Sequence, residues 1–206
     1  QDYHKNKMFK AKEIEGELKY AVRRQEETIY HRQLKMTSPA LNRFRDLVLY
    51  NLEAGQAVLT DNNDIRIYTD GKEKFHALIE EMKRAKKYIH VQYYIIRNDE
   101  VWQDIEKVLI EKAHEGVEVR VLFDSMGCRT MHKRDWDRLK REGIRVAEFF
   151  PAILGQLQMR VNYRNHRKIV VIDGKVGFVG GFNVGREYIG KDEKFGYWRD
   201  THLCIE

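Results

Sequence analysis

The chain has 206 residues, of which 42% are hydrophobic, which is enough for one sizeable core and favours one main domain over two. No apolar run approaches the roughly 18 residues that a membrane-spanning helix needs, and no secretory signal is visible, so this stretch is not expected to cross a membrane by itself. The formal net charge is +6, a modest excess that does not demand a nucleic acid partner.

The first predicted elements are helices that make residues 1–56 a basic lead-in. Apolar residues at helical spacing predict a helix across residues 11–22, and Ser38 followed by Pro39 predicts the start of a second one. Lysines cluster in the first twelve residues, which suits an anionic membrane surface, although a solvated helix end explains them equally well. We therefore expect a segment that either lies close to a membrane or is simply exposed to solvent.

Residues 57–206 are predicted to form one domain of alternating helices and strands. A short hairpin is expected over residues 58–68. The predicted helices cover residues 70–85, 98–116 and 135–142, and the predicted strands cover 88–96, 117–123 and 144–149. Asp70 and Glu73 supply a capping box for the first helix, and Gly116 ends the second. This succession predicts an α/β fold with a mixed, largely parallel β-sheet and helices on both faces.

Charged residues follow two of these predicted strands. In sheets of this kind, ligands bind beyond the carboxyl ends of the parallel strands. Arg97 follows one strand, and Asp124 and Arg129 follow the next, so these three are candidate substrate-binding residues. A structural ion pair or a surface charge is the competing explanation for each of them.

A motif further along the chain points to phosphate chemistry. His166, Lys168 and Asp173 form an H-x-K-x4-D pattern that occurs once. Residues two apart in a strand point to the same face, so the imidazole and the ammonium would lie side by side. Imidazole is a nucleophile near neutral pH, and lysine supplies a positive charge for a phosphate oxygen. Residues 169–172 are apolar on both faces and predict a buried central strand, which would hold the pair at a rigid strand end.

The residues after the motif extend the predicted anion site. Asp173 and Gly174 form a two-residue hairpin signal, so the simplest role of Asp173 is to organise a turn. Gly180 and Gly181 remove side-chain bulk where the backbone passes close to another group, and Asn183 is placed to cap a helix that begins directly after it. Helix N-termini attract anions. Imidazole, ammonium and amide would therefore converge on one anion if the two strands pair.

In identity and spacing, these residues resemble the HKD signature of the phospholipase D superfamily. From about Ala57 to the final residue the chain is most similar to the N-terminal catalytic half of bacterial cardiolipin synthases. The similar segments are YIHVQYYIIR at 88–97, VLFDSMG at 121–127 and YWRDTH at 197–202. The resemblance implies a phospholipase D-like fold and a phosphatidyltransferase that makes cardiolipin from two phosphatidylglycerol molecules, with no metal and no cofactor. It also adds Tyr94 as a substrate-binding candidate, because its segment resembles a pocket-forming strand.

The resemblance assigns a role to each residue of the motif. His166 would attack the phosphorus and form a phosphatidyl-histidine, while Lys168 and Asn183 would hold the non-bridging oxygens. Asp200 matches the acidic residue that orients the histidine in the superfamily, and pairing with a nearby arginine is its alternative role. Asp173 belongs to the catalytic motif but is expected to organise the turn and to contact no phosphate.

A single copy of the motif leaves two sources for the missing general acid. The chain is the first half of a two-motif enzyme on one polypeptide, or it pairs with a second copy of itself as single-motif nucleases of the superfamily do. Because it starts at Gln1 rather than methionine and stops inside a predicted strand, we expect the first, with little activity from the isolated fragment. The resemblance implies phosphatidylglycerol and anionic membrane lipids as partners, no nucleic acid, and a soluble catalytic domain on the cytoplasmic side of the bacterial cell membrane.

Other functions stay open at this stage. A phospholipase D that hydrolyses its lipid shares every motif residue, as does a dimeric nuclease of the superfamily. A non-catalytic membrane-surface module is an alternative from a different class. The seven other histidines show no metal-ligand spacing, so they are expected at the surface or at satisfied core positions.

Overall fold

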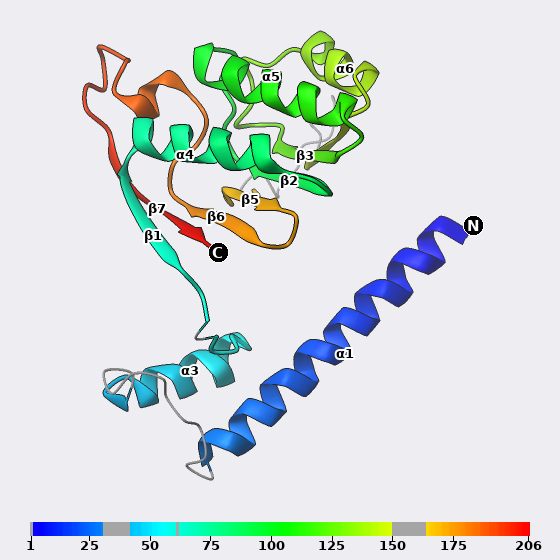
Figure 1. Cartoon of the computed structure of the whole chain (residues 1–206), viewed down its shortest axis with the longest axis vertical. Coiled ribbons are helices and arrows are strands. Elements are labelled where there is room, and N and C mark those ends of the chain that lie inside the picture. The colour runs from blue at the N-terminus through cyan, green and yellow to red at the C-terminus, as the bar shows by residue number, and fades with distance from the viewer. Residues whose placement is uncertain (1, 31–41, 61, 150–163) are drawn as a thin grey trace, which may run out of the picture. The chain divides into compact units, whose positions relative to one another are not determined.

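A computed structural model describes residues 2–30, 42–60, 62–149 and 164–206 of the chain. They fall into two compact units, residues 1–63 and 64–206, drawn in Figure 1. The first unit holds two helices, α1 (Asp2–Tyr30) and α3 (Arg45–Gly55). The helical lead-in is therefore confirmed, while the helix start predicted at Ser38 lies outside the described residues.

The first unit has a small core of its own. Val22, Ile29 and Leu52 are buried together. The Gln25 side chain also binds Leu59 twice, because its Nε2 donates to the carbonyl oxygen at 2.9 Å and its Oε1 accepts the backbone N–H at 2.7 Å. These contacts tie the segment after α3 to α1.

The second unit is built on one mixed sheet of seven strands in the order β1-β7-β6-β5-β2-β3-β4. In chain order the strands are β1 (Ile65–Asp70), β2 (Tyr88–Tyr93), β3 (Glu118–Asp124), β4 (Arg145–Phe149), β5 (Ile169–Ile172), β6 (Val176–Gly180) and β7 (Arg199–Ile205). The pairs β2–β3 and β3–β4 are parallel, and the other four pairs are antiparallel. The α/β class and the mixed sheet are confirmed. Parallel pairs are fewer than predicted, because β5, β6 and β7 join the sheet as antiparallel neighbours.

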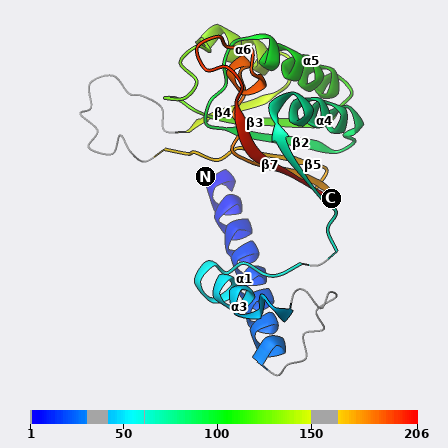
Figure 2. The ribbon, with the colours of Figure 1, turned by 90° about the vertical axis from the view of Figure 1, so that its left-hand side faces the viewer.

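Three helices, α4 (Gly71–Arg84), α5 (Glu100–His114) and α6 (Lys133–Arg141), cover one face of this sheet (Figures 1 and 2). Trp136 of α6 stacks on Phe123 of β3 with 3.9 Å between ring centroids, and its edge meets Trp102 of α5. Lys74 of α4 binds Tyr93 of the adjacent strand β2. Both β2 and β3 bury alternate residues, as strands covered on one side do. Helices were predicted for both faces of the sheet, and within the described part of residues 64–206 the helices α4, α5 and α6 all lie on this one.

Local signals set the helix boundaries largely as predicted. The Asp70 carboxylate accepts the backbone N–H groups of Lys72 at 2.8 Å and Glu73 at 3.2 Å, which caps α4. Asp99 caps α5 in the same way. Gly116 follows α5 with a φ of +87°, a left-handed conformation that glycine adopts without strain.

The first strand of the sheet takes a different partner from the predicted one. Residues 56–60 are not in a strand, so the hairpin predicted for residues 58–68 is wrong. Instead β1 pairs antiparallel with β7, which places Ile65 opposite Ile205 and Tyr68 opposite His202. This partner lies far along the chain, where local turn signals give no information about it.

The turn between β5 and β6 is organised by Asp173, as predicted. Asp173 and Gly174 have φ values of 55° and 69°. The Asp173 carboxylate accepts the backbone N–H groups of Lys86 at 2.8 Å, Lys87 at 2.7 Å and Tyr88 at 2.9 Å. Although burial raises the pKa of Asp173, these N–H groups lower it below its ordinary value. The residue therefore fastens the hairpin to the start of β2.

Candidate active site

His166 and Lys168 lie directly before β5, at the end of the sheet where β2 finishes. Because β5 runs antiparallel to β2, its first residues lie beside the last residues of that strand. Extending the strand register by one residue places Lys168 opposite Tyr93 of β2 and Gly180 of β6. The strand β5 lies between β6 and β2, so the predicted central position is confirmed. The motif is thus held at a rigid sheet end.

The two motif side chains touch each other. The Lys168 Nζ lies 2.9 Å from His166 Nδ1 and 3.2 Å from Nε2, and it donates to the His166 carbonyl oxygen at 2.8 Å. The Tyr94 ring lies beside the imidazole, with 4.6 Å between centroids, and 5.5 Å from Lys168 Nζ. His166 is exposed, whereas Lys168 is buried. The imidazole therefore faces solvent with the lysine behind it, and the predicted proximity of the two groups is confirmed.

Both groups are shifted toward their neutral forms. Partial desolvation by the neighbouring groups lowers the pKa of His166 and the Lys168 charge lowers it further, while the Asp124 charge opposes them. Burial also lowers the pKa of Lys168, and the Asp200 charge opposes it. A neutral imidazole has the lone pair that attack on a phosphorus atom requires. The electrostatics therefore favour a nucleophilic histidine at neutral pH.

Asp124 supports the motif from the end of β3. It is fully buried, and its Oδ2 accepts the Asn165 N–H at 3.2 Å while its Oδ1 accepts the Met126 N–H at 2.9 Å. Arg164 Nη1 lies 3.9 Å from the same carboxylate. Because Asn165 directly precedes His166, Asp124 fixes the backbone that carries the imidazole. Asp124, predicted as a substrate-binding candidate, therefore lies at the site, where its described contacts support the backbone.

Asp200 lies on β7, and its negative charge acts on Lys168. Its Oδ1 accepts the Thr201 N–H at 2.7 Å. Its carboxylate packs against Gly181, where a Cβ atom would meet Oδ1 at 1.9 Å, so a larger residue there would displace the carboxylate. The carboxylate raises the pKa of Lys168. No contact between Asp200 and His166 is found in the part of the chain that the structure describes, so the orienting role of Asp200 stays a prediction.

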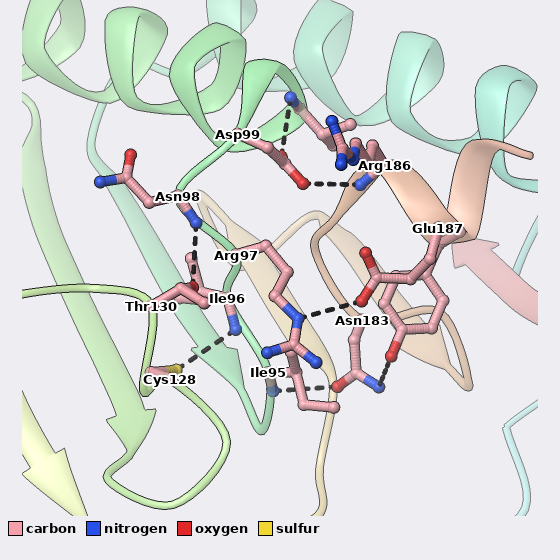
Figure 3. A network of polar contacts seen from close by, with 12 residues as sticks. Ile95, Ile96, Arg97, Asn98, Asp99, Cys128, Thr130, Asn183, Arg186 and Glu187 are labelled. Atoms are coloured by element: carbon pink, nitrogen blue, oxygen red, sulfur yellow. Dashed lines mark hydrogen bonds and ion pairs between the residues drawn. The ribbon is translucent and has the colours of Figure 1, made fainter. Parts of the chain in front are cut away.

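Asn183 points into the protein, between β2 and the short 3-10 helix η1 (Arg186–Ile189), as Figure 3 shows. Its Oδ1 accepts the Ile95 N–H at 3.0 Å, and its Nδ2 donates to the Tyr188 hydroxyl at 3.1 Å. The helix predicted directly after Asn183 is wrong, because η1 begins after Gly185 and is a single short turn. The oxygen-clamp role of Asn183 stays a prediction, and its described contacts tie the end of β2 to η1.

Arg97 lies in a charged cluster beside this amide (Figure 3). Its Nε donates to Glu187 Oε1 at 3.1 Å, and nearby Asp99 Oδ2 accepts the Arg186 N–H at 2.7 Å. These residues line a surface pocket of about 380 Å³. The structural ion pair that was the alternative role of Arg97 is therefore present.

Arg129 lies apart from His166 and Lys168. Its Nη2 contacts Met126 Sδ at 3.2 Å. It lines a different pocket of about 400 Å³, together with Trp136 of α6 and Val146 of β4. No described contact brings Arg129 to the motif.

Buried polar residues near the motif were missed from the sequence. Lys74 is fully buried and donates to the Tyr93 hydroxyl at 2.8 Å. His202 is fully buried, and neither ring nitrogen has a hydrogen-bond partner among the described residues. The expectation of a surface or satisfied position is therefore wrong for His202. The available signal for Lys74 was its place four residues before Leu78, on the buried stripe of α4.

A family model described as "Cardiolipin synthase, PLD-like domain" matches residues 78–195, which is more than half of the chain. The chain belongs to this family. Cardiolipin synthase from Oceanobacillus iheyensis is 47% identical to it over 188 residues, which cover 91% of this chain and 39% of that protein. Cardiolipin synthase from Staphylococcus aureus (strain Mu50) is 52% identical over 163 residues, which cover 79% of this chain and 33% of that protein. This family member thus spans less than half the length of these curated relatives.

Solved structures of low sequence identity share the fold of this PLD-like domain. NucT from Helicobacter pylori aligns with a TM-score of 0.51 at 16% identity, over 70% of this chain and 86% of that chain. Phosphatidylserine synthase from Haemophilus influenzae Rd KW20 aligns with a TM-score of 0.50 at 20% identity, over 68% of this chain and 32% of that chain. The predicted phospholipase D-like fold is confirmed. In the segments that the structure describes, no helix combines the length and apolarity needed to span a bilayer.

Proposed function

We propose that this domain contributes one half of the active site of a phosphatidyltransferase that makes cardiolipin from two phosphatidylglycerol molecules. The observation that carries the proposal is the exposed His166 imidazole, whose pKa is lowered, with Lys168 Nζ 2.9 Å from Nδ1. Family membership supports a phospholipid substrate, since curated relatives are cardiolipin synthases.

In the first step, a ring nitrogen of His166 attacks the phosphorus of phosphatidylglycerol. A P–N bond forms and the P–O bond to the headgroup glycerol breaks, so the glycerol oxygen leaves with the electron pair. A general acid gives this oxygen a proton, and we assign the acid to a second HKD motif, on the same polypeptide or on a second copy of the chain. The Lys168 ammonium compensates the negative charge on the non-bridging oxygens.

In the second step, a hydroxyl group of another phosphatidylglycerol attacks the phosphatidyl-histidine. The new P–O bond forms as the P–N bond breaks, and the former acid takes up the hydroxyl proton. The products are cardiolipin and glycerol, and His166 is restored. Attack by water would give phosphatidic acid instead, which is the reaction of a phospholipase D.

The neighbouring residues receive supporting roles in this scheme. Asp200 orients the imidazole in the substrate complex, and the Asn183 amide offers its remaining N–H to a phosphate oxygen. Tyr94 forms one wall beside the reacting histidine. We place the reaction at an anionic membrane surface on the cytoplasmic side, where the basic lead-in adds attraction.

The test is His166→Ala in the full-length protein, assayed with headgroup-labelled and acyl-labelled phosphatidylglycerol. Turnover is expected to fall by roughly 10³-fold or more with unchanged thermal stability, because the change removes the nucleophile and no buried packing. His90→Ala is the matched control, since His90 lies in β2 with its partner Glu118, and no described contact joins it to a motif residue. It is expected to retain turnover.

The products separate the remaining functions. Cardiolipin and glycerol support transfer, whereas phosphatidic acid without cardiolipin identifies a hydrolase. Full turnover by the His166 variant would remove the histidine from the mechanism. Cleavage of DNA by the purified 206-residue chain, with no lipid turnover by the full-length protein, would favour a nuclease.

A further inference from the structure

A row of buried side chains crosses the sheet behind the His166–Lys168 pair. The strand register, extended by one residue before β5, places Lys168 between Tyr93 of β2 and Gly180 of β6, and Gly180 lies beside His202 of β7. Tyr93 is 1%, Lys168 3% and His202 0% exposed, so these side chains lie on the buried, helix-covered face. The row connects the catalytic lysine with a histidine two strands away.

Gly180 leaves room for the His202 ring in this row, because it has no side chain. A Cβ atom at this position would lie 2.5 Å from the His202 Cα atom and 2.7 Å from its Cγ atom. The Gly180 N–H donates to the Lys168 carbonyl oxygen at 3.3 Å on its other side. The His202 ring therefore occupies the space that a side chain would fill between it and Lys168.

The His202 ring is placed as an apolar residue would be. The rings of Phe182 and Phe178 lie 6.1 and 6.5 Å from it, centroid to centroid. Neither ring nitrogen has a partner among the described residues. Buried nitrogens without partners destabilise a fold, so phenylalanine would suit this position better if packing were its only role.

The charged groups that face His202 keep it neutral. They are Lys74 from α4 and Lys168 before β5, while Tyr68 lies opposite it on β1 and Asp200 precedes it by two residues on β7. Burial lowers the pKa of His202 to about 3, with help from the two lysine charges. A neutral imidazole has one nitrogen that donates and one that accepts, so an unused acceptor lies in the same buried row as Lys168.

We propose that His202 is a positioning residue for Lys168, accepting a hydrogen bond from its ammonium when His166 is engaged with phosphorus. In the structure, the lysine donates to the His166 ring and carbonyl oxygen. Once the attacking nitrogen is bonded to phosphorus, it no longer accepts, and the ammonium needs another acceptor while it binds the phosphate oxygens. Lys74 does not compete for His202 in the same way, because its ammonium donates to the Tyr93 hydroxyl. This inference rests on the proposed function.

His202→Phe separates this role from packing. The variant keeps an aromatic ring between Phe178 and Phe182 and removes both unpartnered nitrogens, so its thermal stability is expected to equal or exceed that of the unchanged protein. With His166 occupied, the Lys168 pKa is expected to be lower than in the unchanged protein, because an acceptor that favours the charged form is lost. Phosphatidyl transfer by the full-length protein is expected to fall about tenfold in kcat, with a smaller change in KM.

The lysine pKa is measured on the 206-residue chain by NMR titration of lysine ε-carbon signals, with orthovanadate added so that a vanadium centre takes the place of the phosphorus on His166, and this readout does not depend on activity. His90→Phe is the control, since His90 stacks on Tyr88 and binds Glu118, and it is expected to change neither the lysine pKa nor kcat. His202→Gln retains an acceptor oxygen and is expected to recover most of the lysine pKa and part of kcat.

An unchanged Lys168 pKa in His202→Phe would overturn the inference. So would a loss of kcat that is matched by a loss of thermal stability and is not recovered by glutamine. If the full-length protein shows no phosphatidyl transfer at all, the proposed function fails, and the NMR titration still decides whether His202 acts on Lys168.

Discussion

Replacement of Asp173 by alanine is expected to lower the free energy of unfolding by about 3–4 kcal/mol. The carboxylate accepts three backbone N–H groups at 2.7–2.9 Å, from Lys86, Lys87 and Tyr88. A hydrogen bond to a charged group is worth about 1.5–3 kcal/mol, and solvent screening reduces each of these partly exposed bonds to about 1 kcal/mol. The φ of 55° adds about 1 kcal/mol of strain for alanine.

Urea unfolding followed by circular dichroism measures this loss. With a slope of about 2 kcal/mol per molar urea, the midpoint is expected to fall by about 1.5–2 M. Asp173→Asn is the matched control, because asparagine tolerates a positive φ and retains one acceptor oxygen, so about half the loss is expected. A midpoint change under about 0.3 M for the alanine variant would refute the assignment of Asp173 to the turn.

Acid titration supplies an independent check on the same residue. The folded-state pKa of Asp173 lies below the ordinary value of 3.8. Its contribution to stability is therefore fully present above pH 3.8 and is lost as the pH falls through the lower folded value. The difference in stability between the unchanged protein and Asp173→Ala should shrink over that acid range, and a difference that stays constant would contradict the pKa shift.

Two further predictions concern the active site itself. Gly181→Ala is expected to destabilise the protein by at least about 2 kcal/mol, because the new Cβ atom would meet Asp200 Oδ1 at 1.9 Å. Gly177→Ala is the control and should destabilise the protein less, since its nearest contact would lie at 4.0 Å. Equal losses of stability in thermal denaturation would refute the clash. The acid limb of kcat/KM for the full-length protein should lie below pH 6.5, since the His166 pKa is lowered from that value. Lys168→Met should move the acid limb of the residual activity to higher pH, because it removes a positive charge that lowers the His166 pKa. A limb that stays in place would show that the Lys168 charge does not act on His166.

The sequence predicted the parts of the fold that depend on local signals. Asp70 caps its helix, and the Asp173-Gly174 dipeptide forms the turn, because each effect acts within a few residues. The proximity of His166 and Lys168 was equally predictable, since their spacing of two residues fixes the face they share.

The remaining features depend on contacts between distant segments. The pairing of β1 with β7 and the position of His202 follow from strand register, which no local pattern records. Asn183 looked like a helix cap from its neighbours, but its amide binds Ile95 and Tyr188 instead. Arg97 forms an ion pair with Glu187, which is 90 residues away in the chain. Such partners become visible only once the sheet is assembled.

The position of β7 between β1 and β6 has a consequence for biosynthesis. Ile65 of β1 pairs with Ile205 of β7, so 140 residues separate the partners (205 − 65). At a synthesis rate of roughly 5–20 residues per second, β1 is made about 7–28 s before its partner. During this interval β1 has no strand to pair with, and β6, once it is made, has an open edge until β7 follows. The nascent chain therefore carries two aggregation-prone strand edges until translation has passed residue 205, and a holding chaperone would protect it for that time.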